Sequence, residues 1–564
     1  MKTFSIISFV LLSTLLLSSC VDQKKPEVVY DFSGYQCMFK GMTPDYIDGV
    51  IPLLPEKQNG KIKNQTIEII TLNHVNTPVG FCLEDAAGEN ILTLLNDTIC
   101  LREYREPAEK SVQKYWDHWV ITHKNNIITL YQNGIQKMAV NGRITSSGKY
   151  PLKIKAILSN EPRMLFSDLF KKITIYDGVL KKTEIEEKFQ KFRNAIEEGN
   201  IPDQSSGYLV NPFVSFVSAH SANISWENHT NSTFLVRYGE KYPLQDSILM
   251  EGRDSIYQLK LENLQAGTNY YAEITDSKDA EPSQKVFFKT APDEEVPFRF
   301  GVIADTESRP FINRHISDGL WNNRPDFFTI LGDLTDGGHQ EFKDQWTQEF
   351  FPGMDKILGR VPVFPVAGNG EGDLFWFNRF FSPPNEHGYY KFQYSNAEFF
   401  VLNSNQKEAF SPGGSQYEWL SRQLDNSSSD WKFVLLHHAP FSSDENDYGD
   451  SYRGPSDMGD MEIRKIVPLC EQYGVDMVMF GHLHCYERSW PLKNGKVHPD
   501  GVLYLQAGGG GGNPEDFAPH RTWFSAKTHR GYHYCIININ NGYLRLDTYD
   551  LEHQLIDTFE KQKN

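Results

Sequence analysis

The chain has 564 residues, too many for a single hydrophobic core, and at roughly 150 residues per domain it should form about three or four domains. Hydrophobic residues make up 39%, charged residues 23%, and the mean hydropathy is -0.49, which excludes a wholly disordered chain and a polytopic membrane protein. The formal net charge is -17. Because this charge repels phosphate backbones, nucleic acid is not expected as a general partner.

The first 20 residues have the pattern of a signal peptide. Met1 and Lys2 precede an apolar run over residues 4–17, which is too short to span a bilayer as a helix. The run ends in Leu-Ser-Ser-Cys at 17–20, which resembles a bacterial lipobox and implies cleavage before Cys20 and lipidation of Cys20. The acyl chains would anchor the protein to a membrane of the bacterial cell envelope, on a face that the sequence leaves open. The alternative is an ordinary cleaved signal peptide with an incidental cysteine.

Six further cysteines follow the signal segment. They are Cys37, Cys82, Cys100, Cys470, Cys485 and Cys535. No pair has the CxxC spacing of a metal site, and an envelope location permits disulfides, so bridges and buried thiols both stay open.

Residues 28–200 alternate short β-rich runs with turns, a pattern that predicts a β-sandwich. The expected strands are 66–72, 116–122, 127–132 and 152–158. The sequence WDHWVIT at 116–122, followed by TLYQNG at 129–134, resembles the paired strands and Asn-Gly turn of laminin-G-like (concanavalin A-like) jelly rolls. Residues 173–185 resemble the last strand and short helix of that family. Such domains often bind glycans and often serve as spacers, and no ligand constellation stands out here.

Residues 208–292 form a second β-rich segment. Trp226 is expected on an early strand, and the sequence LQAGTNY at 264–270 matches the tyrosine-corner region of a fibronectin type III-like β-sandwich. Trp226 and Tyr270 are interpreted as core residues. An acidic linker at 291–295 then leads to the next segment.

From Phe298 onward short apolar strands alternate with helices, which is typical of a layered α/β domain. The expected strands are 300–304, 327–331, 364–367, 433–436 and 477–480, and each is followed by a polar cluster. In open α/β sheets, functional groups collect outside the carboxyl ends of the strands. The clusters contain Asp305, Glu307, Asp333, Asn369, His437, His482 and His484. Carboxylates, an amide oxygen and imidazoles suit Mn, Zn or Fe rather than calcium alone, so we predict a dinuclear metal site.

The order and the residues of these motifs over 208–560 resemble those of the calcineurin-like metallophosphoesterases, particularly the purple acid phosphatase branch. The resemblance implies a four-layer α/β domain at 297–560, preceded by the fibronectin-like domain. The metal ligands it implies are Asp305, Asp333 and His484 for metal A, and Asn369, His437 and His482 together with the bridging Asp333 for metal B. A pair of ions can bind both a hydroxide and phosphoryl oxygens, so the implied reaction is the attack of a metal-activated hydroxide on a phosphoester substrate.

The third motif departs from the family pattern. The family usually has a His that assists the transition state or the leaving group, and this chain has Gly370 instead. Because acid catalysis commonly supplies about 10² to 10⁴ in rate, we expect reduced activity on poor leaving groups. His438, beside a ligand, His339, in the loop after the second Asp motif, and Glu371 are candidate substitutes.

Two further positions bear on the metals. Purple acid phosphatases place a Tyr three residues after the second Asp, where this chain has Asp336, so a Tyr-ligated ferric site is not expected. Glu307 stands where other branches have a ligating His, and it either coordinates metal A or only hydrogen-bonds to a ligand. The glycine run 508–512 lacks the Lys-Ser/Thr of a P-loop, and in this family such glycines shape a loop near the active-site rim.

Three functions agree with this sequence. The favoured one is an envelope lipoprotein that hydrolyses phosphomonoesters or phosphodiesters, with the jelly roll presenting it to a glycan surface. The first alternative is a catalytically weak or inactive phosphoglycan-binding lipoprotein that keeps its metals, and the second is a glycan-binding adhesin with a C-terminal scaffold. Retention of all six ligands argues against a degenerate site, because burying charged groups without purpose is costly.

Overall fold

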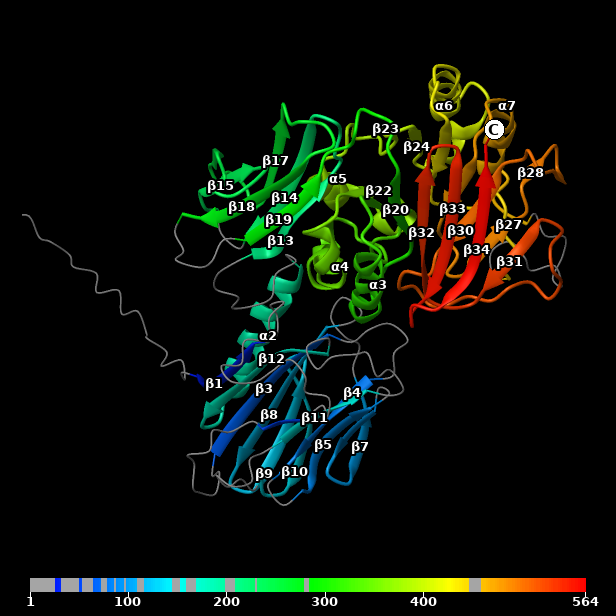
Figure 1. Ribbon diagram of the computed structural model, residues 1–564. Coiled ribbons are helices and arrows are strands. Elements are labelled where there is room, and N and C mark those ends of the chain that lie inside the picture. Colours follow the sequence, from blue (N-terminus) through cyan, green and yellow to red (C-terminus); the bar gives the residue numbers. More distant parts are fainter. Residues whose placement is uncertain are drawn as a thin grey trace, which may run out of the picture.

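Figure 1 shows the computed structural model of the chain. The structure describes residues 26–31, 50–52, 64–72, 79–85, 88–95, 98–108, 116–144, 153–158, 169–197, 208–228, 231–277, 284–445 and 458–563. The signal segment, the lipidation candidate Cys20 and Cys37 lie outside these residues. The other five cysteines are free thiols. Within the described ranges, no helix has both the length and the apolar character needed to cross a bilayer.

Two six-stranded sheets form the N-terminal part of the molecule (Figure 1). The first has the order β1 (Pro26–Asp31), β12 (Phe170–Asp177), β3 (Asn64–Leu72), β8 (Trp116–Lys124), β9 (Ile127–Gln132) and β10 (Ile135–Asn141). The second has the order β2 (Val50–Pro52), β11 (Lys153–Leu158), β4 (Val79–Glu84), β5 (Asn90–Leu95), β6 (Thr98–Leu101) and β7 (Tyr104–Pro107). Ile69 of the first sheet and Phe81 of the second are fully buried in one core. The β-rich character predicted for this region is therefore confirmed.

Local sequence explains two features of the first sheet. Asn133 and Gly134 both have positive φ, 51° and 78°, and connect β9 to β10 by the two-residue turn that an Asn-Gly pair favours. The helix α2 (Lys182–Glu197) buries Phe192 and Ile196 against Trp116 of β8, so an apolar stripe on the helix fixes it to the sheet.

The segment after α2 joins the sheet of the following α/β region. This nine-stranded sheet has the order β17 (Ile256–Glu262), β14 (Ser221–Asn228), β13 (Tyr208–Ser215), β22 (Val363–Pro365), β21 (Phe327–Ile330), β20 (Phe298–Ile303), β32 (His533–Asn540), β33 (Tyr543–Asp550) and β34 (Leu555–Gln562). At the junction, Ser215 pairs in parallel with Val363, and the Phe216 amide donates to the Val363 carbonyl at 3.2 Å. The sequence suggested two separate segments, whereas the structure connects them through one continuous sheet.

A four-stranded sheet packs on the β13, β14 and β17 end of the large sheet. Its order is β16 (Asp246–Met250), β15 (Phe234–Gly239), β18 (Asn269–Asp276) and β19 (Gln284–Lys289). Trp226 and Tyr270 are buried in the core between them, at 0% and 6% exposure, as expected for core residues. The Tyr270 hydroxyl accepts a hydrogen bond from the Gln265 amide at 2.9 Å, the contact that defines a tyrosine corner.

A second, seven-stranded sheet faces the large sheet in the C-terminal part. Its order is β23 (Tyr390–Tyr394), β24 (Ala397–Val401), β25 (Trp431–Leu435), β26 (Met477–Phe480), β30 (Leu503–Ala507), β27 (Tyr486–Ser489) and β31 (Ser525–His529). Phe300 of the large sheet stands edge-on to Phe399 and Phe433 of this sheet, with ring centroids 5.2 and 5.7 Å apart. The two sheets therefore share one aromatic core.

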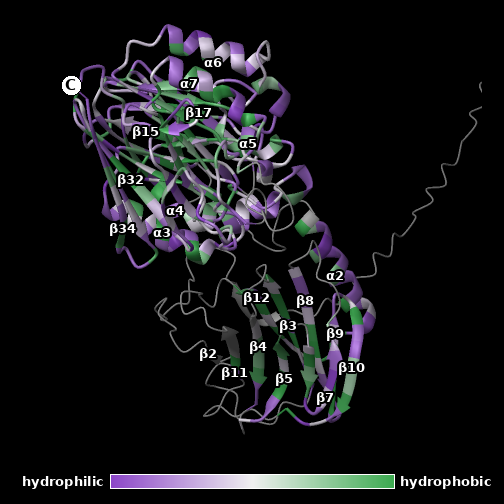
Figure 2. Cartoon of the chain, turned by 90° about the vertical axis from the view of Figure 1, so that its right-hand side faces the viewer, coloured by the Kyte–Doolittle hydropathy of each residue, from purple (hydrophilic) through white to green (hydrophobic). Residues whose placement is uncertain are grey.

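Helices lie outside both sheets. The helices α3 (Pro310–Asn322) and α4 (Phe351–Leu358) pack on the large sheet, whereas α6 (Ser415–Asp425) and α7 (Val467–Gln472) pack on the second one. Figure 2 shows hydrophobic strands inside and largely hydrophilic turns on α6. Parallel strands β20, β21 and β22 in one sheet, and β25 and β26 in the other, end near one another, so the residues that follow them gather at one place.

The N-terminal sheets contact the α/β region through a buried polar bond. The Trp116 indole N–H donates to a carboxylate oxygen of Asp344 at 2.9 Å. Burial raises the pKa of Asp344 to about 6, although the bond from Trp116 acts in the opposite direction. The second Asp344 oxygen, Oδ1, is buried without a hydrogen-bond partner. This contact couples the two regions within the described part of the chain.

Candidate metal centre

The residues after the strands are held in an uncommon backbone conformation. Asp305, Glu307, Asp333 and His482 have φ values of 56°, 42°, 49° and 75°. Non-glycine residues in this left-handed region cost about 1–3 kcal/mol each, and such strain clusters at functional sites. Sharp turns directly after the strands bring these side chains together at the edge of the two sheets.

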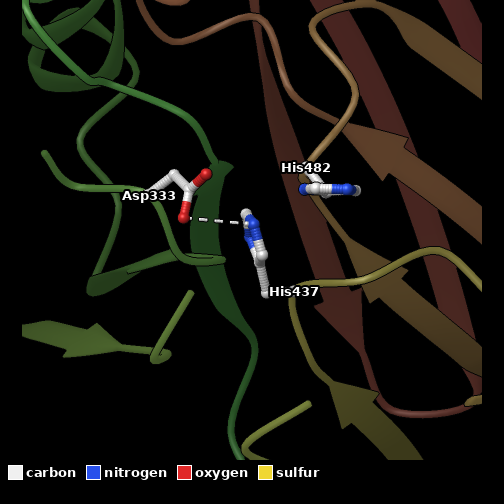
Figure 3. Close-up of side chains that lie close together, drawn as sticks. All are labelled: Asp333, His437 and His482. Carbon is white, nitrogen blue, oxygen red and sulfur yellow. Dashed lines mark ion pairs between the residues drawn. The ribbon is translucent and has the colours of Figure 1, made fainter. Parts of the chain in front are cut away.

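Asp333, His437 and His482 form the first ligand group (Figure 3). One donor atom from each lies within 4.8 Å of the others. The His437 Nδ1 donates to the Leu331 carbonyl at 2.8 Å, which leaves Nε2 directed at Asp333 Oδ1 and Asn369 Oδ1, 3.2 and 3.1 Å away. A histidine fixed through Nδ1 in this way is oriented to coordinate a metal through Nε2. Together with Asn369, this group makes up the four residues predicted for metal B.

The electrostatics of this group favour a cation. Burial lowers the pKa of His437, but the charge of Asp333 and the bond to it raise the pKa above its ordinary value. Burial alone would raise the pKa of Asp333. The charge of His437 and the hydrogen bond to it act in the opposite direction, and the pKa of Asp333 is lowered. Both shifts favour an ionised Asp333 beside a protonated His437, a negative charge with a buried cationic partner.

Asp305, Glu307 and His484 form the second ligand group. The His484 Nδ1 lies 3.0 Å from the Asn513 carbonyl and donates to it, and its Nε2 lies 2.9 Å from Glu307 Oε1 and 3.9 Å from Asp305 Oδ1. Burial raises the pKa of Asp305 well above its usual range, and the charges of Asp333 and Glu307 add to this, whereas His484 opposes it. Glu307 thus reaches the coordinating nitrogen of His484, in agreement with a role at metal A.

The two groups together fit a pair of divalent ions. They supply carboxylates, one amide oxygen and imidazole nitrogens, the donor types that Mn, Zn and Fe(II) accept. Asp305 is fully buried and Asp333 is 5% exposed. Because desolvated carboxylates repel one another, cations bound between them would offset their charge.

Glycines form one wall of the centre. A Cβ on Gly512 would lie 2.6 Å from the His484 ring, and a Cβ on Gly481 would lie 2.6 Å from Asp305 Oδ2. A Cβ on Gly508 would overlap the Leu483 carbonyl, and the Gly512 amide donates to the Asp305 carbonyl at 2.9 Å. The glycine run 508–512 therefore allows the backbone to approach the ligands closely. Sequence reasoning placed this run near the rim but could not connect it to individual ligands.

Of the three candidate acids, His438 packs against the ring of a predicted ligand. Its ring centroid is 4.5 Å from that of His482, and its Nδ1 lies 2.8 Å from the Ser404 hydroxyl. Burial, followed by the neighbouring His437, lowers the pKa of His438 far below its ordinary value, so its imidazole is neutral. Ser404 also accepts the His438 amide at 2.9 Å, and sequence reasoning did not identify it as a support of the site.

Glu371 and His339 have different surroundings. Glu371 is fully buried, and its oxygens accept backbone amides from Leu334, Asp333 and Gly368 at 2.5, 3.2 and 2.5 Å. Through these hydrogen bonds the Glu371 side chain connects the backbone of the second motif to the backbone of the third. His339 is exposed, and its ring packs against Gly372, where an added Cβ would lie 2.6 Å from the ring. Asp336 is exposed as well.

Comparison with known proteins agrees with this geometry. Residues 298–486 match the calcineurin-like phosphoesterase family, and this range includes all five strands predicted to precede the polar clusters and all six predicted ligands. Purple acid phosphatase 15 of Arabidopsis thaliana is 27% identical over 314 residues, covering 49% of this chain and 57% of that protein. Purple acid phosphatase 23 of the same plant is 26% identical over 314 residues, covering 49% of this chain and 66% of that protein. The matches thus span less than two thirds of these relatives.

The solved structure of purple acid phosphatase PPD1 from yellow lupin (Lupinus luteus) seeds resembles the fold. It aligns with a TM-score of 0.58 at 15% identity, over 91% of this chain and 95% of that one. Residues 298–486 are therefore a calcineurin-like phosphoesterase domain. The chain as a whole has the fold of this purple acid phosphatase, and purple acid phosphatases are among its sequence relatives.

Proposed function

We propose that this protein is a metal-dependent phosphoester hydrolase that uses two ions held by Asp305, Asp333, Asn369, His437, His482 and His484, with Glu307 as a further ligand of metal A. The observation that carries the proposal is the pair of oriented histidines. His437 and His484 each donate Nδ1 to a backbone carbonyl and direct Nε2 at carboxylate oxygens. This arrangement prepares both imidazoles for coordination before any ion binds.

The residues of the site divide into the metal ligands and His438, which lies beside them. When bound, a pair of ions supplies Lewis acidity to phosphoryl oxygens and lowers the pKa of water. The buried carboxylates and fixed imidazoles hold that charge in a site of low dielectric, where it acts most strongly. His438 lies beside His482, with ring centroids 4.5 Å apart, and we assign it to a hydrogen bond with the substrate; because its imidazole is neutral, the proton for the leaving group would come from solvent water.

Hydrolysis of nitrophenyl phosphate and bis-nitrophenyl phosphate tests this function. We expect turnover that is lost after chelation and restored by Mn, Zn or Fe(II), and the ratio of the two rates gives the preference for monoesters or diesters. Nitrophenolate is a good leaving group and needs little acid catalysis. A protein that binds two ions yet does not turn over either ester would contradict the proposal and favour the alternative, an inactive phosphoglycan-binding protein.

We also propose that the protein is a lipoprotein of a bacterial cell envelope, anchored to the membrane through Cys20. The support is the apolar segment that ends in Leu-Ser-Ser-Cys. A Cys20→Ser variant is expected to move from the membrane fraction to the soluble fraction. Retention of this variant on membranes in the absence of other anchors would contradict the assignment.

The two β-rich regions complete the proposal. We assign residues 28–200 to a laminin-G-like jelly roll, supported by two six-stranded sheets and the Asn-Gly hairpin. We assign residues 208–292 to a fibronectin type III-like sandwich, supported by the hydrogen bond to Tyr270. In this arrangement the jelly roll would present the hydrolase to a glycan surface, and the membrane anchor would precede it.

A further inference from the structure

The glycine-rich loop at residues 508–515, which follows β30, fixes one ligand of metal A at two points. The His484 Nδ1 donates to the Asn513 carbonyl at 3.0 Å, and the His484 amide donates to the Glu515 carboxylate at 2.8 Å. The loop therefore holds both the imidazole and the backbone of His484. Its position decides where the coordinating Nε2 of this histidine points.

The first five residues of the loop, 508–512, are all glycines and have no side chains that could pack against the domain. Glycine also loses more conformational freedom on folding than any other residue. A Cβ on Gly510 would overlap the Ala304 carbonyl, and a Cβ on Gly511 would overlap the Thr306 carbonyl, so the close approach to the first motif requires glycine. Hydrogen bonds from neighbouring elements must therefore supply the order that side-chain packing cannot.

Two buried polar side chains at the start of α3 donate such bonds. The Arg309 Nη1 donates to the Gly511 carbonyl at 2.6 Å, and its Nη2 donates to the side-chain oxygen of Asn513. The Asn313 side-chain amide donates to the Gly510 carbonyl at 2.9 Å. Arg309 is 4% exposed and Asn313 is fully buried. The helix thus holds three residues of the loop through side-chain donors.

The shape of the Arg309 guanidinium suits this task. Its two nitrogens reach residues on either side of Gly512, so one planar group fixes the spacing of Gly511 and Asn513. Hydrogen bonds from a charged donor are also roughly twice as strong as those from a neutral one. Because the side chain and the carbonyl of Asn513 belong to one residue, the bond to the side chain restricts the carbonyl that orients His484.

We propose that Arg309 is a positioning residue for metal A, which acts through the glycine-rich loop on His484. The inference rests on the two-metal centre of the proposed function. His437, a ligand of metal B, is oriented by the Leu331 carbonyl, which does not belong to this loop. Loss of the Arg309 guanidinium should therefore affect one ion and leave the other in place.

Zinc titration of the metal-free, full-length protein in competition with a chelating indicator tests the role. Arg309→Met removes the donors and keeps a long side chain, and we expect it to weaken one of two zinc ions about 10-fold and to leave the other unchanged. Removal of a group bonded directly to a ligating histidine costs about 10–100-fold, and Arg309 acts through one residue more. Asn513→Ala, which removes the acceptor of Nη2, should weaken the same ion about 3-fold.

Two further variants identify the affected ion. In a His437→Ala protein, which lacks a ligand of metal B, Arg309→Met should still weaken the remaining ion about 10-fold. In a His484→Ala protein, Arg309→Met should leave zinc affinity unchanged, because no imidazole remains for the loop to orient. An equal effect of Arg309→Met in both proteins would show a general loss of structure and would overturn the proposal.

Thermal melting of the metal-free variants shows whether each one is folded. If Arg309→Met does not fold, Asn513→Ala, at a half-buried position, replaces it in the same comparisons. Arg422→Met, at an exposed position of α6, is the control and should bind both ions as the parent does. A parent with two zinc ions whose affinities neither Arg309→Met nor Asn513→Ala changes would overturn this inference alone. A parent that binds no zinc, manganese or iron would overturn the proposed function and this inference together.

Discussion

Asp333→Asn is expected to lower the turnover of nitrophenyl phosphate by at least about 10³-fold, equivalent to roughly 4 kcal/mol of transition-state stabilisation. Asp333 lies between the two ligand groups: its Oδ1 is 3.2 Å from His437 Nε2, and its charge acts on Asp305. An amide has the same shape but no charge, so it is a poor bridge between two cations. We expect the metal content to fall from two ions per chain to one or fewer, as measured by elemental analysis.

The stability of the metal-free protein separates a ligand from a structural residue. In the parent the Gly370 amide donates to Asp333 Oδ1 at 2.6 Å. The side-chain oxygen of the Asn variant can still accept this hydrogen bond. Removing the charge also relieves repulsion of the buried Asp305 and Glu371. The variant also loses the charge partner of the buried His437, which lowers the pKa of Asp333 in the parent, so the metal-free variant should melt at the same temperature as the metal-free parent or at a lower one, and metals should stabilise it less.

Asp425→Asn is the matched control, because Asp425 is exposed at the end of α6. It should keep both ions and full turnover. An Asp333→Asn protein that kept two ions and more than a tenth of the activity would show that Asp333 does not bridge the metals.

The ends of the strands could be predicted from the sequence because their signal is local. Each apolar run before Asp305, Asp333 or His437 is short, buried and followed at once by polar residues, and the structure contains strands at all these positions. The predicted ligands therefore meet at one edge. The pairing of Ser215 with Val363 has no such signal, because the contact joins residues far apart in the chain and depends on backbone atoms that every residue has.

Contacts made by backbone groups explain what the sequence could not predict. From the sequence alone, where only its position beside Gly370 is known, Glu371 could be interpreted as a catalytic acid. In the structure its oxygens are occupied by three backbone amides, which no sequence pattern encodes. The same holds for the Leu331 carbonyl, which orients His437 although leucine itself carries no polar side chain.

Gly370→His is expected to destabilise the protein and lower its metal content, rather than to increase its activity by restoring the histidine of the family. A Cβ at this position would overlap the Thr335 carbonyl and lie 2.9 Å from Asp333 Oδ1. The neighbouring segment cannot easily move away. The Gly370 carbonyl accepts the amides of Gly337 and Gly338 at 2.9 and 2.7 Å, and the Thr335 hydroxyl at 2.8 Å.

The loss of packing and of part of these hydrogen bonds should cost about 3 kcal/mol or more, measured by chemical unfolding of the metal-free protein. Gly370→Ala should have most of this effect, because the overlap begins at the Cβ atom that Ala and His share. Gly413→Ala is the control: its φ is +85°, and no atom lies within 4 Å of its added Cβ, so it should cost only about 1 kcal/mol.

Comparison of the two variants at Gly370 then decides what this glycine does. If Ala and His are equally damaging, the close packing of the second and third motifs requires glycine, and the proton for the leaving group must come from elsewhere than position 370. If Gly370→His folds, keeps two ions and hydrolyses esters of poor leaving groups faster than the parent, the neighbouring loop has room for the ring. That result would contradict the packing argument and identify the missing histidine as the cause of slow turnover.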